Sequence, residues 1–267
     1  ASGSDHVSPP AGDEMAFLRE HGAEGYRLSC AARVLGDLLI MVPEESQARK
    51  QIIRKAATER TIEVDPAIRQ VYVEVEPPRL EAPRGDWERL ASALAEEWGL
   101  HDLTIDHAVL RHLQNTLRKG EWAVTVTVWQ EHKVIDVRPG YHEGAYGLAV
   151  DIGTTTVAGH LCNLRTGAVL ATEAMMNPQV AYGEDVMSRV SYAMNRPDGL
   201  ATMHQAIIKA LNELAGRAAA QAGIRISDIY EAVLVGNTVM HHILLDIHPE
   251  QIGNAPFALS LDGPLDI

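Results

Sequence analysis

The stretch LAVDIGTTT at residues 148–156 decides the fold of this 267-residue chain. Its first residues are apolar and predict a buried strand that ends at Asp151. Gly153 permits a tight turn and lets backbone amides approach an anion closely. The hydroxyls of Thr154, Thr155 and Thr156 can bond phosphate oxygens beside those amides. Asp151 would repel phosphate, so its expected role is to hold a Mg²⁺ ion between itself and the phosphates.

The segments around this turn predict strands on both sides of it. Residues 155–164 and 168–175 have strand composition and are separated by a turn at 165–167, so three antiparallel strands are expected. Helices are predicted over 183–195 and 199–222, a strand over 232–235 and a helix over 238–245. A Walker-type loop would place a helix and a Lys-Ser/Thr pair after its glycines. That class and the dinucleotide fingerprint are therefore excluded here.

Two further groups of polar residues are candidates for the same site. Glu184 and Asp185 are expected in the first turn of a helix, where the helix dipole favours carboxylates. They either cap the helix or orient a water that attacks the γ-phosphate. Gly236, Asn237 and Thr238 form a strand-to-helix turn, which either faces the phosphate cleft or is only a cap. The residues alone leave both pairs of alternatives open.

The first half of the chain predicts smaller units. A short helix over 14–21 and strands over 33–42 and 71–75 are expected. Pro77 and Pro78 stop both helix and sheet, which places a domain boundary near 77–85. Beyond it, helices over 86–98 and 106–118 and strands over 122–129 and 134–137 predict a small α+β domain.

Composition and charge exclude several classes of protein. The net charge of −13 and the pI near 5.3 do not suit a protein that binds nucleic-acid phosphates through a basic face. No apolar run approaches the roughly 18 residues that a membrane span requires, and the N-terminal residues do not resemble a signal peptide. The two cysteines, Cys30 and Cys162, are too few for a disulfide framework. A reducing, cytoplasmic location is expected.

Cys162 and two histidines are expected to take no part in chemistry. Cys162 lies on a predicted strand among ordinary neighbours and is interpreted as structural. His241 and His242 are adjacent, so they point in different directions from a helix, which is poor spacing for a shared metal site.

Longer motifs resemble a known family. The stretches MNPQVAYGEDVMSRV (176–190) and VGNTVMHH (235–242), with the turn at 151–156, resemble the ATPase part of the reductive activators of corrinoid proteins. These activators belong to the superfamily of acetate and sugar kinases, Hsp70 and actin. The turn alone marks only the superfamily, whereas the two longer stretches are specific to the activators. Residues 86–140 resemble that family's middle domain, and residues 25–42 resemble the closing segment of a plant-type [2Fe–2S] ferredoxin domain.

The resemblance implies a multi-domain fold of the α/β class. Residues 144–267 would form the first half of an actin-like, ribonuclease H-like ATPase domain. A small α+β middle domain over 86–143, a linker over 43–85 and a ferredoxin-like remnant over 1–42 would precede it.

The resemblance also implies a function. Such proteins take an electron at an iron–sulfur cluster and use ATP to reduce an inactive Co(II) corrinoid protein to Co(I) in a methyltransferase system. The implied half site binds ATP through Gly153–Thr156 and Gly236–Thr238 and Mg²⁺ through Asp151, with Glu184 and Asp185 as the other catalytic candidates. A corrinoid protein and an electron-donor protein are the implied partners, and a homodimer is left open. The alternatives are a small-molecule kinase of the same superfamily and a non-catalytic docking module for a corrinoid protein.

Cys30 marks a departure from the family pattern. It matches the fourth ligand of a plant-type cluster, but the C-x₄-C-x₂-C segment that supplies the other three ligands does not occur in the chain. A [2Fe–2S] cluster is therefore expected only in a longer parent protein. The chain is expected to be a fragment that lacks the electron entry and half of the ATP site, with little ATP affinity or turnover of its own.

Overall fold

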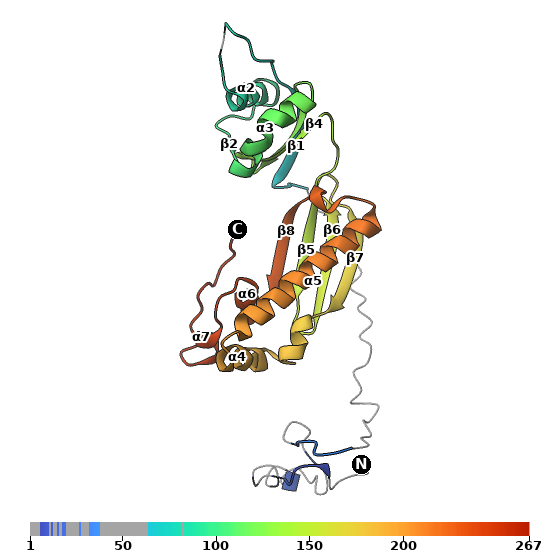
Figure 1. The fold of residues 1–267 in the computed structure, drawn as a ribbon, viewed down its shortest axis with the longest axis vertical. Coiled ribbons are helices and arrows are strands. Elements are labelled where there is room, and N and C mark those ends of the chain that lie inside the picture. The colour runs from blue at the N-terminus through green and yellow to red at the C-terminus, as the bar shows by residue number, and fades with distance from the viewer. Residues whose placement is uncertain are drawn as a thin grey trace. The chain divides into compact units, whose positions relative to one another are not determined.

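The computed structural model describes residues 6–10, 12, 15, 18–19, 27, 32–37, 64–81 and 83–266, which Figure 1 shows as a coloured ribbon. The chain divides into two units, Ala1–Arg54 and Lys55–Ile267. In the first unit, Val34 forms an antiparallel bridge with Val7, within the segment predicted as a strand over 33–42. Cys30 and most of the helix predicted over 14–21 lie outside the described residues.

The second unit begins with a small domain, residues 64–140, in which a four-stranded sheet packs against helices. Its elements are β1 (Ile68–Glu74), α2 (Asp86–Trp98), β2 (Thr104–Ile105), α3 (His107–Lys119), β3 (Ala123–Trp129) and β4 (Lys133–Pro139). The strands lie in the order β1-β3-β4-β2. Leucines of both helices and valines of the strands form one apolar core. The helices and strands predicted between residues 86 and 140 are confirmed to within two residues at each end.

β1 changes the predicted boundary of this domain. It pairs antiparallel with β3 along its whole length, from Ile68 opposite Trp129 to Glu74 opposite Ala123. The segment predicted as a linker, 43–85, therefore contains a strand of the small domain. Pro77 and Pro78 lie in the connection from β1 to α2. Prolines end a helix or strand at a connection inside one domain just as they do at a boundary between domains.

The large domain, residues 146–266, is the second part of this unit. Its sheet contains β5 (Tyr146–Ile152), β6 (Thr156–Asn163), β7 (Val169–Met176) and β8 (Ile229–Gly236), in the order β7-β6-β5-β8. The first three strands are antiparallel neighbours as predicted, and β5 pairs in parallel with β8. The helical elements are η3 (Pro178–Tyr182), α4 (Val186–Asn195), α5 (Gly199–Ala222), η4 (Ile226–Asp228), α6 (Thr238–Leu244) and α7 (Glu250–Gly253). Among the described helices, none is long and apolar enough to cross a lipid bilayer.

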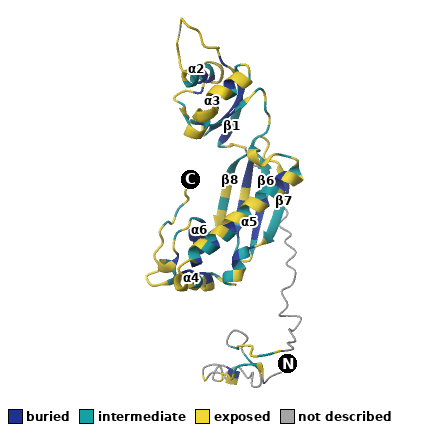
Figure 2. Ribbon diagram, viewed as in Figure 1, coloured by how far each residue is buried: buried dark blue, intermediate teal, exposed yellow. Residues whose placement is uncertain are grey.

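The long helix α5 crosses one face of the second sheet (Figure 1). Buried residues, dark blue in Figure 2, lie on these strands and on α5 and belong to one core. Leu148, Val150 and Ile152 alternate along β5 and belong to the same core as Leu214 of α5. At Gly159 of β6, a Cβ atom would lie 2.5 Å from the side chain of Leu214. A side chain at this position would therefore require the Leu214 side chain to move.

Polar side chains join the two domains of the second unit. Tyr230 of β8 donates a hydrogen bond to Asp136 of β4 at 2.8 Å, and Arg138 donates one to the Ser227 oxygen at 2.7 Å and pairs with Asp228. Burial, together with the neighbouring Asp136 carboxylate, raises the pKa of Tyr230 to about 12, so this hydroxyl stays protonated at neutral pH and remains a donor. The start of β8 is thus fixed to the small domain.

We predict that Leu214→Ala lowers the free energy of unfolding by about 2–5 kcal/mol, because Leu214 is fully buried and its loss leaves a cavity beneath the sheet. Ile208→Ala is the matched control on the same helix, since Ile208 is 37 % exposed. The two variants are compared by urea unfolding. Equal losses of stability would contradict the packing of α5 described above.

Candidate functional site

The predicted phosphate turn, Gly153–Thr156, lies at the carboxyl ends of two parallel strands. β5 ends at Ile152, which pairs with Gly236 at the end of β8, so the turns that follow the two strands are neighbours. Asn237 joins these turns, because its Nδ2 donates to Oγ1 of Thr154 at 3.3 Å. Ligands of open α/β sheets bind beyond the carboxyl ends of the strands. The structure thus brings the two predicted phosphate-binding groups together at the edge where that rule places a ligand.

The carbonyl groups of the turn are held from the protein side. The Gly153 oxygen accepts a hydrogen bond from Nδ2 of Asn177 at 2.8 Å, and the Thr155 oxygen accepts one from the backbone N–H of Asn177 at 2.8 Å. The Thr154 oxygen, which lies between them in the chain, accepts a hydrogen bond from Nη2 of Arg189. Three consecutive carbonyls are therefore fixed by two residues.

The amide groups of the turn are directed away from those two residues. The C=O and N–H of a planar trans peptide point in opposite directions. Fixing the carbonyls of Gly153 and Thr154 therefore aims the N–H groups of Thr154 and Thr155 away from Asn177 and Arg189. Within the part of the chain that the structure describes, neither of these amides donates to a protein acceptor. Successive amides that point outward in a turn form a donor set that binds anions.

Gly153 allows the turn to be this tight. Its N–H donates to the Thr156 oxygen at 2.9 Å, and a Cβ atom at this position would lie 2.6 Å from the same oxygen. A side chain here would push the two strands of the hairpin apart.

Asp151 lies on the face of the sheet opposite to the core. Its neighbours Val150 and Ile152 are buried, so the alternation of the strand puts Asp151 on the other face. It pairs with Val235 of β8 and Ala158 of β6, and it is partly buried. The carboxylate is therefore part of the sheet edge from which the phosphate turn emerges.

A buried polar network behind the turn was missed in the sequence. Asn177, Gln179 and Arg189 have at most 1 % of their surface exposed. The N–H of Gln179 donates to Oδ1 of Asn177 at 2.9 Å, and Nη1 of Arg189 donates to Oε1 of Gln179 at 3.3 Å. The one available signal was the density of polar residues in segment 176–190, which carries the family resemblance without showing which of its side chains turn inward.

The two carboxylates before α4 have different surroundings. Asp185 is the N-cap of α4: its Oδ1 accepts from the N–H of Ser188 at 2.8 Å and its Oδ2 accepts from the Ser188 hydroxyl at 2.9 Å. These hydrogen bonds lower the pKa of Asp185. Glu184 is exposed. Both residues precede the helix, which begins at Val186, so the prediction that they lie in its first turn is wrong. The helix begins three residues after the predicted start at residue 183, because Asp185 itself supplies the cap.

Asn237 caps α6 and also contacts the turn after β5. Its Oδ1 accepts from the N–H of Met240 at 3.0 Å and caps α6, while its Nδ2 contacts Thr154. The cap fixes the side chain, and the fixed side chain holds the phosphate turn against β8.

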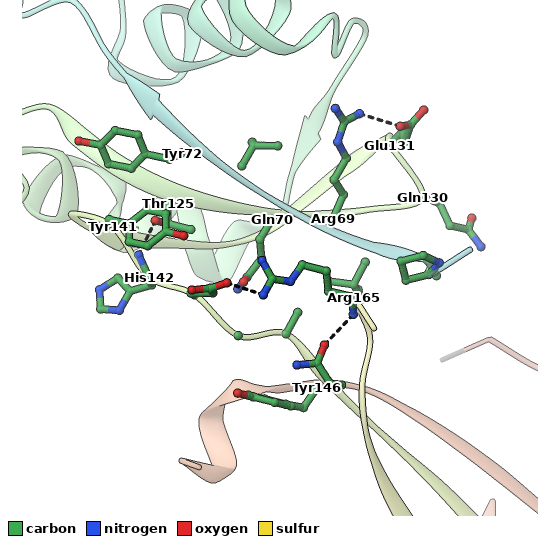
Figure 3. A pocket seen from close by; sticks show the side chains of 18 of the residues that line it. Arg69, Gln70, Tyr72, Thr125, Gln130, Glu131, Tyr141, His142, Tyr146 and Arg165 are labelled. Atoms are coloured by element: carbon green, nitrogen blue, oxygen red, sulfur yellow. Dashed lines mark hydrogen bonds and ion pairs between the residues drawn. The ribbon is translucent and has the colours of Figure 1, made fainter. Parts of the chain in front are cut away.

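A cavity of about 1040 Å³ lies elsewhere, at the opposite end of β5. Figure 3 shows its lining, with Tyr72 and Tyr141 on one side and Tyr146, the first residue of β5, on the other. Arg165 extends between them and pairs with Glu143. None of the predicted site residues lines this cavity. Volume alone therefore does not locate the predicted phosphate site.

Cys162 and the histidines have local partners. Burial raises the pKa of the Cys162 thiol, which disfavours the reactive thiolate. His242 is buried, with Nδ1 2.8 Å from the Thr238 oxygen and Nε2 accepting from the N–H of Ser260 at 3.2 Å. Over residues 64–81 and 83–266 and the described N-terminal positions, no cluster of His, Cys, Asp or Glu side chains could hold a metal ion.

Comparison with known families identifies both domains. The RACo linker region matches residues 57–144, and the RACo middle region matches residues 146–267. The chain belongs to the RACo family. The α/β fold class predicted for it is confirmed as well, because the mixed sheets and their helices match the fold of a reductive activator.

Individual relatives of this RACo chain are longer than the chain itself. It is 34 % identical over 168 residues to the corrinoid activation enzyme RamQ of Eubacterium limosum, a match that covers 60 % of this chain and 28 % of RamQ. A solved structure titled reductive activator for corrinoid, iron-sulfur protein is 32 % identical with a TM-score of 0.67, and the match covers 91 % of this chain and 41 % of that one. The chain thus spans less than half the length of either relative.

The family match corrects one assignment. Residues 86–140 were predicted to resemble the family's middle domain, but they lie within its linker region, and the middle region begins at Tyr146. The inclusion of β1 in the small domain agrees with the start of the linker match at residue 57.

We predict that Asn177→Ala destabilises this RACo chain by about 1–3 kcal/mol, because it removes a fully buried side chain and leaves the partly buried Gly153 carbonyl without its donor. Asn195→Ala at the exposed end of α4 is the control and should change stability by less than about 0.5 kcal/mol. Both are measured by chemical denaturation. A loss at position 177 no larger than that at position 195 would show that the turn is not held from behind.

Proposed function

We propose that the protein that carries this chain reduces the cobalt of a corrinoid protein from Co(II) to Co(I), and that ATP binding and hydrolysis at the phosphate turn drive this uphill electron transfer. The observation that carries the proposal is the outward-facing amide pair of Thr154 and Thr155 in a chain of the RACo family. The names of RamQ and of the solved relative support the corrinoid protein as the partner. An electron-donor protein is the second partner that this reaction requires.

The residues at the turn fit a magnesium nucleotide. The amides of Thr154 and Thr155 and the threonine hydroxyls would donate to phosphate oxygens, and Gly236 to Thr238 would close the site from β8. Asp151 supplies the carboxylate oxygen that Mg²⁺ prefers, directly or through water. When bound, Mg²⁺ neutralises charge on the phosphates during their transfer. The charge of this ion would offset the repulsion between the Asp151 carboxylate and the phosphates.

Glu184 is the better candidate to orient the attacking water. Both oxygens of Asp185 already accept hydrogen bonds from Ser188, so Asp185 is committed to the helix cap. Glu184 is exposed beside it. Since Gly183 accepts a hydrogen bond from Arg189, which also holds Thr154, the loop that carries Glu184 is tied to the turn.

The chain's own cysteines do not fit an iron–sulfur cluster. A [2Fe–2S] cluster of the plant type needs four cysteine ligands, and the 267 residues contain only Cys30 and Cys162. Cys30 as the fourth ligand stays a prediction for a longer protein, and no electron-transfer step is assigned to a residue of this chain.

We expect Asp151→Asn to weaken Mg-ATP binding at least about tenfold, which corresponds to about 1.4 kcal/mol, because it removes the charged magnesium ligand. ATP-dependent formation of Co(I), followed by absorbance in the protein that carries this chain with its corrinoid partner and a reductant, should fall to background. Asp198→Asn is the matched control, since Asp198 is exposed and its side chain makes no capping hydrogen bond.

Unchanged ATP dependence in Asp151→Asn would refute the magnesium role. Equal loss in Asp198→Asn would show that the effect is one of overall charge.

A further inference from the structure

A fully buried cation lies directly behind the phosphate turn. Arg189 of α4 has no exposed surface. Its Nη2 donates to the Thr154 oxygen, and its Nε donates to the Gly183 oxygen at 2.9 Å. Its Nη1 contacts Oε1 of Gln179 at 3.3 Å and Sδ of Met240 at 2.9 Å. One guanidinium therefore connects the turn, the loop before α4, η3 and α6.

Every one of these partners is electrically neutral. In the described part of the chain, no carboxylate oxygen lies within 4.0 Å of the guanidinium. Burial lowers the pKa of Arg189, an effect that the charge of Asp185 partly opposes, yet an arginine side chain stays charged in proteins. A buried charge without a paired ion is unfavourable. A negative charge that binds beside the turn would offset this cost.

The hydrogen bond to Thr154 has a direct effect on the next amide. The Thr154 carbonyl and the Thr155 N–H belong to the same trans peptide and point in opposite directions. A cation bound to this carbonyl polarises the peptide and makes its N–H a stronger donor. The charge of Arg189 is thus transmitted through one peptide group to the side on which a phosphate would bind.

We propose that Arg189 is a positioning residue for the phosphate turn: it aims and polarises the Thr155 amide, and its buried charge is the counter-charge of the bound phosphate. The inference rests on the proposed nucleotide site and adds to it the residue that sets its affinity for anions. Arg189 acts through the turn and needs no contact with the nucleotide.

The test compares Arg189→Gln, which removes the charge, with Arg189→Lys, which keeps the charge and loses the planar fork. Arg196→Gln is the matched control, because Arg196 follows the last residue of the same helix, is exposed, and stacks on the Tyr192 ring. The probe is inorganic triphosphate with Mg²⁺, titrated calorimetrically into the protein that carries this chain. Thermal unfolding with and without triphosphate is measured in parallel.

We expect Arg189→Gln to bind triphosphate about 10- to 100-fold more weakly than the unsubstituted protein, and Arg189→Lys to recover part of the loss. Arg196→Gln should bind normally. The stabilisation that triphosphate gives to the unsubstituted protein should shrink in Arg189→Gln, because the counter-charge is gone. A purely structural role would lower the melting temperature without ligand and leave the affinity of the folded protein unchanged.

This inference is overturned if the Arg189→Gln variant folds and binds triphosphate as tightly as the unsubstituted protein. That result would leave the proposed function standing. If Arg189→Gln does not fold, Arg189→Lys decides: the inference predicts a folded protein with weakened binding, and unchanged binding contradicts it. If the unsubstituted protein itself binds no triphosphate, the proposed nucleotide site fails together with this inference.

Discussion

The structure of the phosphate turn depends on three carbonyl groups that are fixed from behind. Asn177 and Arg189 hold the oxygens of Gly153, Thr154 and Thr155, and planar trans peptides then leave no freedom in where the amides point. The geometry of the proposed anion site is thus set by buried side chains that would not touch the ligand. Because both side chains are fully buried, they would hold the turn in place before a nucleotide binds, which would reduce the ordering that binding requires.

The strand β8 connects this turn with the small domain. Tyr230, near the start of β8, donates to Asp136 of the small domain, and Asn237, which follows the end of β8, contacts Thr154. The same strand lies parallel to β5 over its whole length. The candidate site and the contact between the two domains therefore lie at opposite ends of β8.

Local patterns in the sequence were enough to predict most elements of the fold. Alternating apolar residues predicted β3, a continuous apolar run predicted β5, helical spacing predicted α2 and α3, and the LAVDIGTTT stretch predicted a tight turn between β5 and β6. These features arise from neighbours within a few residues. The domain boundary predicted near 77–85 was wrong for the same reason. Pro77 and Pro78 indicate where an element stops, but they do not show that β1 pairs with β3.

The buried network could not be predicted because its contacts are distant in sequence. Arg189 meets Thr154 across 35 residues and Met240 across 51, and no spacing rule relates such pairs. The role of Asp185 depended likewise on which residue began α4, and composition did not settle the difference of three positions between residue 183 and Val186.

Amide hydrogen exchange, resolved for single residues of the protein that carries this chain, tests the central claim most directly. The account predicts that Mg-ATP slows exchange of the Thr154 and Thr155 amides strongly, whereas Mg²⁺ alone does not, because these two N–H groups would donate to phosphate oxygens. Binding of Mg-ATP that leaves the exchange of both amides unchanged would contradict it.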